Sequence, residues 1–107
     1  MKSDKRNHPR QNFVKKVTLI TLKERVYIFQ SENLSISGMS LVKENPLPIG
    51  TEGFLSMIVK NDDIIRKINS RFRVVHHQPG SDGAAGIGIE FVDMEAEHID
   101  FLKKMLV

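Results

Sequence analysis

The chain has 107 residues, which is enough for one domain with a modest core. Hydrophobic residues make up 40% and charged residues 27%, as is ordinary for a globular protein, and no apolar run is long enough to cross a membrane. The chain has no cysteine, which excludes disulfides and thiolate metal sites, and no secretory signal opens it. We therefore expect a cytoplasmic protein.

Positive charge is concentrated in the first residues of the chain. Residues 1–16 hold six basic side chains against one acid, so this segment carries +5; because the whole chain carries +3, the remainder carries −2. Such a segment favours a negatively charged partner, which could be nucleic acid, a nucleotide or an acidic lipid, although a merely solvated basic leader has the same charge pattern. We predict a flexible basic arm over residues 1–12 and one domain over residues 13–107.

Two arginines flank a proline in the arm, in the segment KRNHPRQNF at residues 5–13. Pro9 cannot lie inside a helix and favours an extended backbone at His8, so Arg6 and Arg10 are predicted to lie on a loop or turn. Each planar guanidinium group can bind a phosphate, or the O6/N7 edge of guanine, with two hydrogen bonds. The spacing is weak evidence by itself, because arginine pairs at this distance are common by chance.

From residue 13 onward, short β-branched segments alternate with Gly, Pro, Asn and Asp, which is typical of an all-β barrel or sandwich. The predicted strands cover residues 13–22, 25–32, 34–43, 52–60, 64–77 and 85–92. The strand over residues 64–77 has the clearest two-residue period. Its expected core face holds Ile64, Ile68, Phe72 and Val74, and its expected solvent face holds Lys67, Asn69, Arg71 and Arg73.

The segment NLSISGMSL, residues 33–41, shifts its apolar positions from even to odd numbers near Gly38. A strand can do this only with a bulge or a tight turn, and glycine tolerates the backbone that such a kink demands. The kink is expected to direct Asn33, Ser35 and Ser37 outward, as short polar groups suited to a base edge. A plain hairpin turn with polar residues on the solvent face explains the same residues.

The last segment, residues 93–107, changes to a helical period, with acids at its start and lysines near its end. Asp93 is a plausible N-cap. We predict one amphipathic C-terminal helix that covers an open end or side of the barrel. Its apolar stripe is expected to contain Ile99, Leu102, Met105 and Leu106.

Taken together, the RxxxR pattern of the arm and the NxSxxG pattern that begins at Asn33 resemble the PilZ domain, a bacterial receptor for cyclic di-GMP. The segment GIGIEFVDM at residues 86–94 is similar to the closing strand of that family, so the resemblance covers essentially the whole chain. It implies a six-stranded antiparallel PilZ-type β-barrel with a C-terminal α-helix, no catalytic residues and no cofactor.

The resemblance also implies which residues bind cyclic di-GMP. Arg6 and Arg10 would bind its guanines and phosphates, while Asn33, Ser35 and Gly38 would form the opposite wall of the site. Three further residues are candidates for the same site: Lys5, Ser37 and Gly88. In the family, the residue at the place of Lys5 is associated with whether one or two ligand molecules bind, and a basic residue there favours two.

The expected binding reaction involves ordering of the arm. A good bidentate contact between arginine and guanine contributes roughly 1 to 3 kcal/mol, whereas ordering the backbone costs about 1 to 2 kcal/mol per residue. Both arginines are therefore expected to be needed, and the arm is expected to be loose without ligand and ordered with it. The implied function is a receptor or adaptor that changes its interaction with a partner protein, in motility, pilus, biofilm or polysaccharide control.

Two alternatives stay open. A small basic barrel could bind single-stranded nucleic acid through the arm, although one Tyr and no Trp leave few side chains for stacking, and most Phe residues lie in patterns that suit the core. A PilZ-like protein could also have lost its ligand and act only as an adaptor, against which the intact motifs argue. No metal site is predicted, because His76 and His77 are adjacent in a strand and should point to opposite faces.

Overall fold

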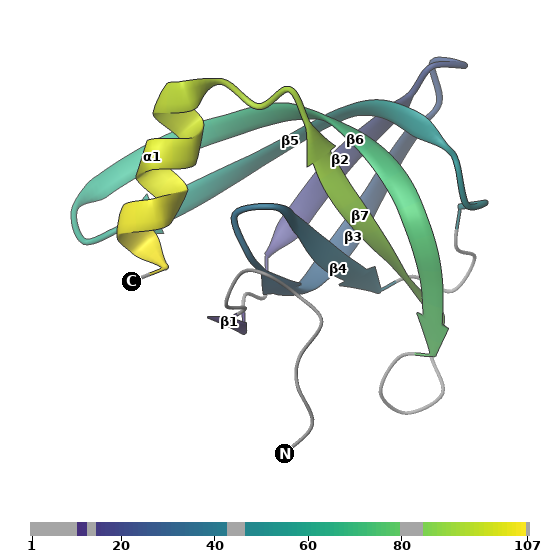
Figure 1. Cartoon of the computed structure of the whole chain (residues 1–107), viewed down its shortest axis with the longest axis horizontal. Helices are drawn as coiled ribbons and strands as arrows, with labels where there is room; N and C mark the ends of the chain where they lie inside the picture. The colour runs from purple at the N-terminus through teal and green to yellow at the C-terminus, as the bar shows by residue number, and fades with distance from the viewer. Residues whose placement is uncertain (1–10, 13–14, 43–46, 80–84, 107) are drawn as a thin grey trace.

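The computed structural model describes residues 11–12, 15–42, 47–79 and 85–106. Seven strands and one helix follow one another in this part of the chain (Figure 1). Their bounds are β1 (Gln11–Asn12), β2 (Lys16–Thr21), β3 (Val26–Leu34), β4 (Gly38–Val42), β5 (Glu52–Asn61), β6 (Ile64–Pro79), β7 (Ala85–Val92) and α1 (Ala96–Met105). The six predicted strands and the C-terminal helix are confirmed, but the third strand was predicted to begin at residue 34, whereas β4 begins at Gly38.

The strands form an antiparallel barrel. The sheet order is β1-β3-β2-β5-β6-β7-β4, and an additional pairing between β3 and β4 closes six of these strands into a ring. The seventh strand, β1, pairs with the C-terminal end of β3. It lies on the same edge of β3 as β2, which pairs with the N-terminal part of that strand, whereas β4 pairs with the opposite edge. Strand β1 therefore continues the line of β2 along β3.

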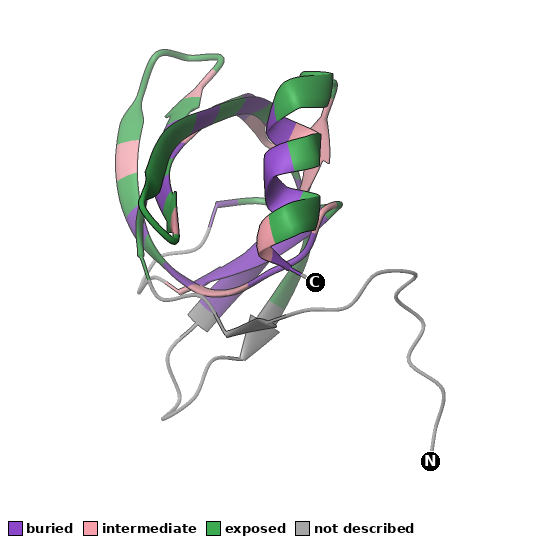
Figure 2. Cartoon of the chain, turned by 90° about the vertical axis from the view of Figure 1, so that its left-hand side faces the viewer, coloured by how far each residue is buried: buried purple, intermediate pink, exposed green. Residues whose placement is uncertain are grey.

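The inward-facing residues of the barrel strands form one core. Figure 2 shows buried and exposed residues alternating along the strands, as expected where one face of a sheet is packed and the other is solvated. Burial of one large apolar side chain contributes about 1.5–3 kcal/mol, so the core is the main source of stability. Its fully buried large side chains include Phe29, Phe72, Leu19, Leu34, Met39, Leu41 and Ile68.

The hairpin of β5 and β6 extends beyond the barrel. Strand β2 pairs with β5 only as far as Ser56, and β7 pairs with β6 only from Arg71 onward. Ile64, at the turn of this hairpin, is 52% exposed, so its predicted core position is wrong. The other three residues predicted for the core face of this strand are buried: Ile68, Phe72 and Val74.

Helix α1 packs against the extended part of the hairpin (Figure 1). The backbone N–H of Asn69 in β6 donates to Nδ1 of His98 at 3.4 Å, and the Arg66 guanidinium lies 5.7 Å from the centre of the Phe101 ring. The helix therefore covers strand residues that β2 and β7 leave unpaired. No helix within the described ranges is both long and apolar enough to span a membrane.

The packed face of α1 differs from the predicted stripe. Leu102 and Leu106 are buried as expected, but His98 and Phe101 are buried as well, whereas Ile99 is only partly buried. Phe101, Leu102 and Leu106 belong to the same hydrophobic cluster as the core of the barrel.

The start of α1 also differs from the prediction. The N-cap is Glu95, whose side chain makes no capping hydrogen bond, and Asp93 instead has a positive φ of 56° in the bend that follows β7. The prediction of Asp93 as N-cap is therefore wrong.

Candidate functional site

A tight turn of residues 35–37 joins β3 to β4 in the motif segment. Ser35 is 1% exposed, and its backbone N–H donates to the Gly38 carbonyl at 2.9 Å. Its hydroxyl lies 3.3 Å from the same carbonyl and accepts from the Ser37 N–H at 3.3 Å. The prediction that Ser35 points outward is therefore wrong, because its hydroxyl is used inside the turn; Ser37 is the exposed serine.

The two serines are expected to differ in their effect on stability. We expect Ser35→Ala to lower the free energy of unfolding by about 1–3 kcal/mol, since it removes hydrogen-bond partners from enclosed backbone groups. We expect Ser37→Ala to change it by less than about 1 kcal/mol, because this side chain is exposed and its removal breaks only the 3.2 Å hydrogen bond between the Ser37 and Ser35 hydroxyls. Urea unfolding of both variants measures the difference, and equal losses would contradict the structural role of Ser35.

The core-facing positions change parity twice along β3 and β4. Strand β3 has a bulge between Ser31 and Asn33, so its core positions change from odd-numbered Phe29 to even-numbered Leu34. The turn then returns the core positions to odd numbers at Met39. The sequence located the second change and missed the bulge, although the five-residue separation of Phe29 and Leu34 was a signal for it.

Gly38 is required because a neighbouring strand lies too close for a side chain, and not because its backbone has a positive φ. Among the glycines in the described ranges, only Gly50 has a positive φ, at 93°. A Cβ atom on Gly38 would lie 2.1 Å from the carbonyl oxygen of Ile89 in β7, the strand with which β4 pairs. The prediction of a special backbone at Gly38 is wrong, and the glycine instead allows β7 to approach closely.

The strand register aligns several motif residues in one row across five strands, which we call the polar row. Asn33 of β3 pairs with Asn12 of β1 on one side and with Ser40 of β4 on the other. Ser40 pairs with Gly88 of β7, and Gly88 pairs with His76 of β6. The second motif and the closing strand therefore meet in this row.

The polar row lies on the outer side of the barrel. Ser40 is located between the core residues Met39 and Leu41, so its side chain points away from the core. A Cβ atom on Gly88 would lie 2.2 Å from Cε1 of His76, so the imidazole ring covers the glycine. The row therefore combines amide, hydroxyl and imidazole groups with one position that has no side chain, and its Ser40 is buried.

The predicted arm residues Lys5, Arg6 and Arg10 lie outside the described residues, so their roles stay predictions. The described structure begins at Gln11, which pairs with Leu34 beside Asn33. The chain that follows the RxxxR pattern is thus attached directly to the strand that carries the NxSxxG pattern.

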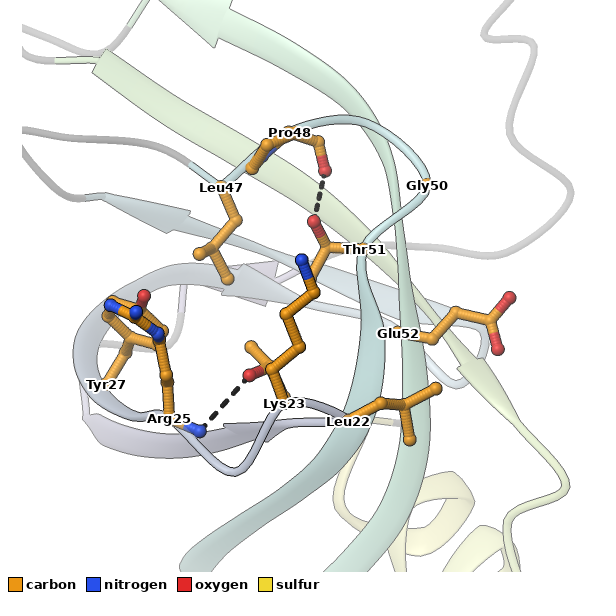
Figure 3. Close-up of a pocket in the computed structure, with 10 residues that line it drawn as sticks. Leu22, Lys23, Arg25, Tyr27, Leu47, Pro48, Gly50, Thr51 and Glu52 are labelled. Carbon is orange, nitrogen blue, oxygen red and sulfur yellow. Dashed lines mark hydrogen bonds between the residues drawn. The ribbon is translucent and has the colours of Figure 1, made fainter.

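A pocket of about 420 Å³ lies at the other end of β3 (Figure 3). It lies between the turn that joins β2 to β3, which contributes Lys23 and Arg25, and the loop before β5, which contributes Leu47, Pro48 and Thr51. No motif residue lines this pocket, and the nine residues of β3 separate it from the motif turn by about 27 Å at 3.4 Å per residue.

The start of α1 gathers three groups that could hold a metal ion, a possibility the sequence analysis did not consider. The ligand atoms of Glu95, Glu97 and His98 lie within 4.8 Å of one another. Both glutamates are exposed, and Nδ1 of His98 lies 3.2 Å from the Asn69 carbonyl oxygen as well as accepting from the Asn69 N–H. Packing of the helix on β6 is sufficient to explain the position of His98.

Comparison with known families gives one match over nearly the whole chain. The model of the PilZ domain matches residues 4–107. A comparison with curated proteins found no match.

Solved structures show the same fold. The chain is similar to the inhibitor of motility MotI/DgrA of Bacillus subtilis, with a TM-score of 0.83 and 18% identity over 97% of this chain and 50% of that protein. It is also similar to the PilZ domain of YcgR from Escherichia coli with c-di-GMP, with a TM-score of 0.70 and 10% identity over 96% and 89% of the two chains. The chain spans half the length of the Bacillus protein. At these identities the likeness establishes a common barrel with a C-terminal helix.

Proposed function

Because the chain belongs to the PilZ domain family, we propose that it is a non-enzymatic receptor for cyclic di-GMP that alters the interaction of the protein with a partner. The observation that supports this most strongly is the β1–β3 register, in which Gln11 pairs with Leu34 and Asn12 with Asn33. This pairing attaches the two residues that directly follow Arg10 in the sequence to the strand that carries the second motif. The similar Escherichia coli domain was solved with c-di-GMP.

In this proposal the residues of the two motifs have different tasks. Arg6 and Arg10 bind phosphates and guanine edges through bidentate hydrogen bonds. Asn33 and Ser37 face the ligand from the barrel. Ser35 acts indirectly by holding the turn, to which its hydroxyl is bonded.

The glycines and Lys5 complete the proposed site. Gly38 acts indirectly by allowing β7 to lie close to β4, and Gly88 leaves room on the outer side of the polar row. Lys5 favours the binding of a second ligand molecule. The similar Bacillus subtilis protein is described as an inhibitor of motility, so motility is the first process in which we propose to test the receptor.

Titration calorimetry with cyclic di-GMP tests the proposal. We expect wild type to bind one or two molecules per chain, and Arg6→Ala and Arg10→Ala each to weaken binding by about tenfold or more, because one bidentate contact contributes about 1–3 kcal/mol. Lys104→Ala, which removes an exposed cation from the last turn of α1, is the matched control and should bind as wild type does. Absence of binding to wild type, or unchanged affinity in both arginine variants, would overturn the proposal.

A further inference from the structure

The outward face of strands β3, β2, β5 and β6, which we call the outer face, is unusually apolar. Outward positions of a half-buried antiparallel sheet are normally polar. On these four strands, the large apolar residues that point away from the core and are 40% to 65% exposed include Ile20, Val26, Ile28, Phe54, Ile58, Ile65 and Val75. Most phenylalanines were expected in the core, and Phe54 is an exception.

Three of the apolar residues of the outer face are direct neighbours in space. Ile20 pairs with Val26 on one side and with Phe54 on the other, so three apolar side chains lie in a row across β3, β2 and β5. Scattered single apolar residues are normal on a protein surface, but a contiguous group indicates a contact surface.

The outer face is hollowed beside this row. Two adjoining hollows of about 340 and 560 Å³ share Thr18, Ser56 and Lys67, because small side chains occupy the middle of β2 and β5. On β2 the hollow lies between Ile20 and Lys16, which are about 13 Å apart at 3.3 Å per residue. A hollowed face fits a protein segment better than the surface of a membrane.

Charge on the outer face is predominantly basic. Its outward positions carry five cations, Lys16, Lys60, Lys67, Arg71 and Arg73, against two acids, Glu52 and the partly exposed Glu32 at the bulge of β3. Arg73 and Arg71 form ion pairs with acidic neighbours. Within the described ranges, Lys16 and Lys67 at the hollow form no ion pair. They are therefore available to acidic groups of a partner.

We propose that the outer face docks a segment of another protein in which apolar side chains alternate with acidic ones. The apolar row would bury the hydrophobic side of the segment, and Lys16 and Lys67 would pair with its acids at the edge. A second copy of this chain is disfavoured as the occupant, because this face carries more cations than acids and two such faces would repel each other. The inference goes beyond cyclic di-GMP binding and does not depend on it.

Selection of short random peptides displayed on phage, against the wild-type protein without cyclic di-GMP, tests this docking surface. We expect the enriched peptides to combine acidic and apolar residues. A synthetic copy, measured by fluorescence anisotropy, should bind about tenfold or more weakly to Phe54→Thr and to Lys67→Gln. Both replaced side chains are exposed, so the variants should fold, which circular dichroism checks. Ile58→Thr provides a third variant of the face.

Matched controls separate this surface from general stickiness. Ile49→Thr removes an equally exposed apolar side chain in the loop before β5, and Lys104→Gln removes a cation from α1; both should bind the peptide as wild type does. Enriched peptides without acids, or equal binding to the face variants, would overturn the proposal. The proposal would also be overturned if wild type bound to phosphatidylserine vesicles and Phe54→Thr did not. Self-association of wild type in sedimentation, abolished by Phe54→Thr, would overturn it as well. Because no cyclic di-GMP is added, failure here leaves the ligand titration unaffected.

Discussion

Replacement of Gly38 by alanine is expected to lower the free energy of unfolding by about 3 kcal/mol or more. The new Cβ atom would lie 2.1 Å from the Ile89 carbonyl oxygen, which belongs to the backbone of β7 and cannot rotate away. Strands β4 and β7 would have to separate where Gly38 pairs with Glu90, and this ladder is one of those that close the barrel. Urea unfolding of the variant and wild type measures the loss.

Gly88→Ala is the matched control on the facing strand. Its Cβ atom would also be too close to a neighbour, at 2.2 Å, but that neighbour is the imidazole ring of His76, which can move to another rotamer. We therefore expect a loss below about 1 kcal/mol. An equal or larger loss in Gly88→Ala than in Gly38→Ala would contradict the distinction between a backbone and a side-chain obstacle.

Truncation of Phe72 to alanine is expected to lower the free energy of unfolding by about 3–5 kcal/mol, the usual cost of such a cavity. Phe72 is 1% exposed and lies in β6 where this strand pairs with both β5 and β7. Ile64→Ala in the same strand should cost less than about 1 kcal/mol, because Ile64 is 52% exposed at the hairpin turn. Thermal and urea unfolding compare the two variants, and similar losses would mean that the end of the hairpin is packed like the barrel.

Strands such as β5 and β6 were predictable because they have one buried and one exposed face. The period from Ile68 to Val74 in β6 follows directly from this geometry, and the core positions predicted there are buried. Ile64 has the same chemistry and the same parity, yet it is exposed. The difference in exposure between Ile64 and the buried residues depends on where β2 and β7 stop pairing with the β5–β6 hairpin. The apolar pattern of one strand does not indicate how far its neighbouring strands extend.

The candidate site was predictable in position but not in the roles of its residues. The pattern around Asn33 correctly located a tight turn before Gly38. Whether Ser35 points outward depends on hydrogen bonds that close only once the turn has formed, and the need for a glycine at residue 38 depends on β7, far along the chain. The roles of Arg6 and Arg10 stay predictions.

The outer face shows a further limit of sequence patterns. Ile20 and Phe54 read as ordinary strand residues, because apolar side chains at alternate positions predict a core. Their exposure follows from the pairings between β3, β2 and β5, which place them on the side of the sheet that the core does not use.

Closure of the barrel also sets an order on the formation of the protein during synthesis. The hairpins β2–β3 and β3–β4 join strands that are adjacent in the sequence, whereas β4 pairs with the distant β7. Gly38 therefore cannot pair until Glu90 has been synthesised. Until then one edge of β4 has no partner strand, and unpaired edges are templates for association with other chains. The nascent chain is therefore most exposed to aggregation before residue 92 leaves the ribosome, and a stall ahead of β7 would be more harmful than one within α1.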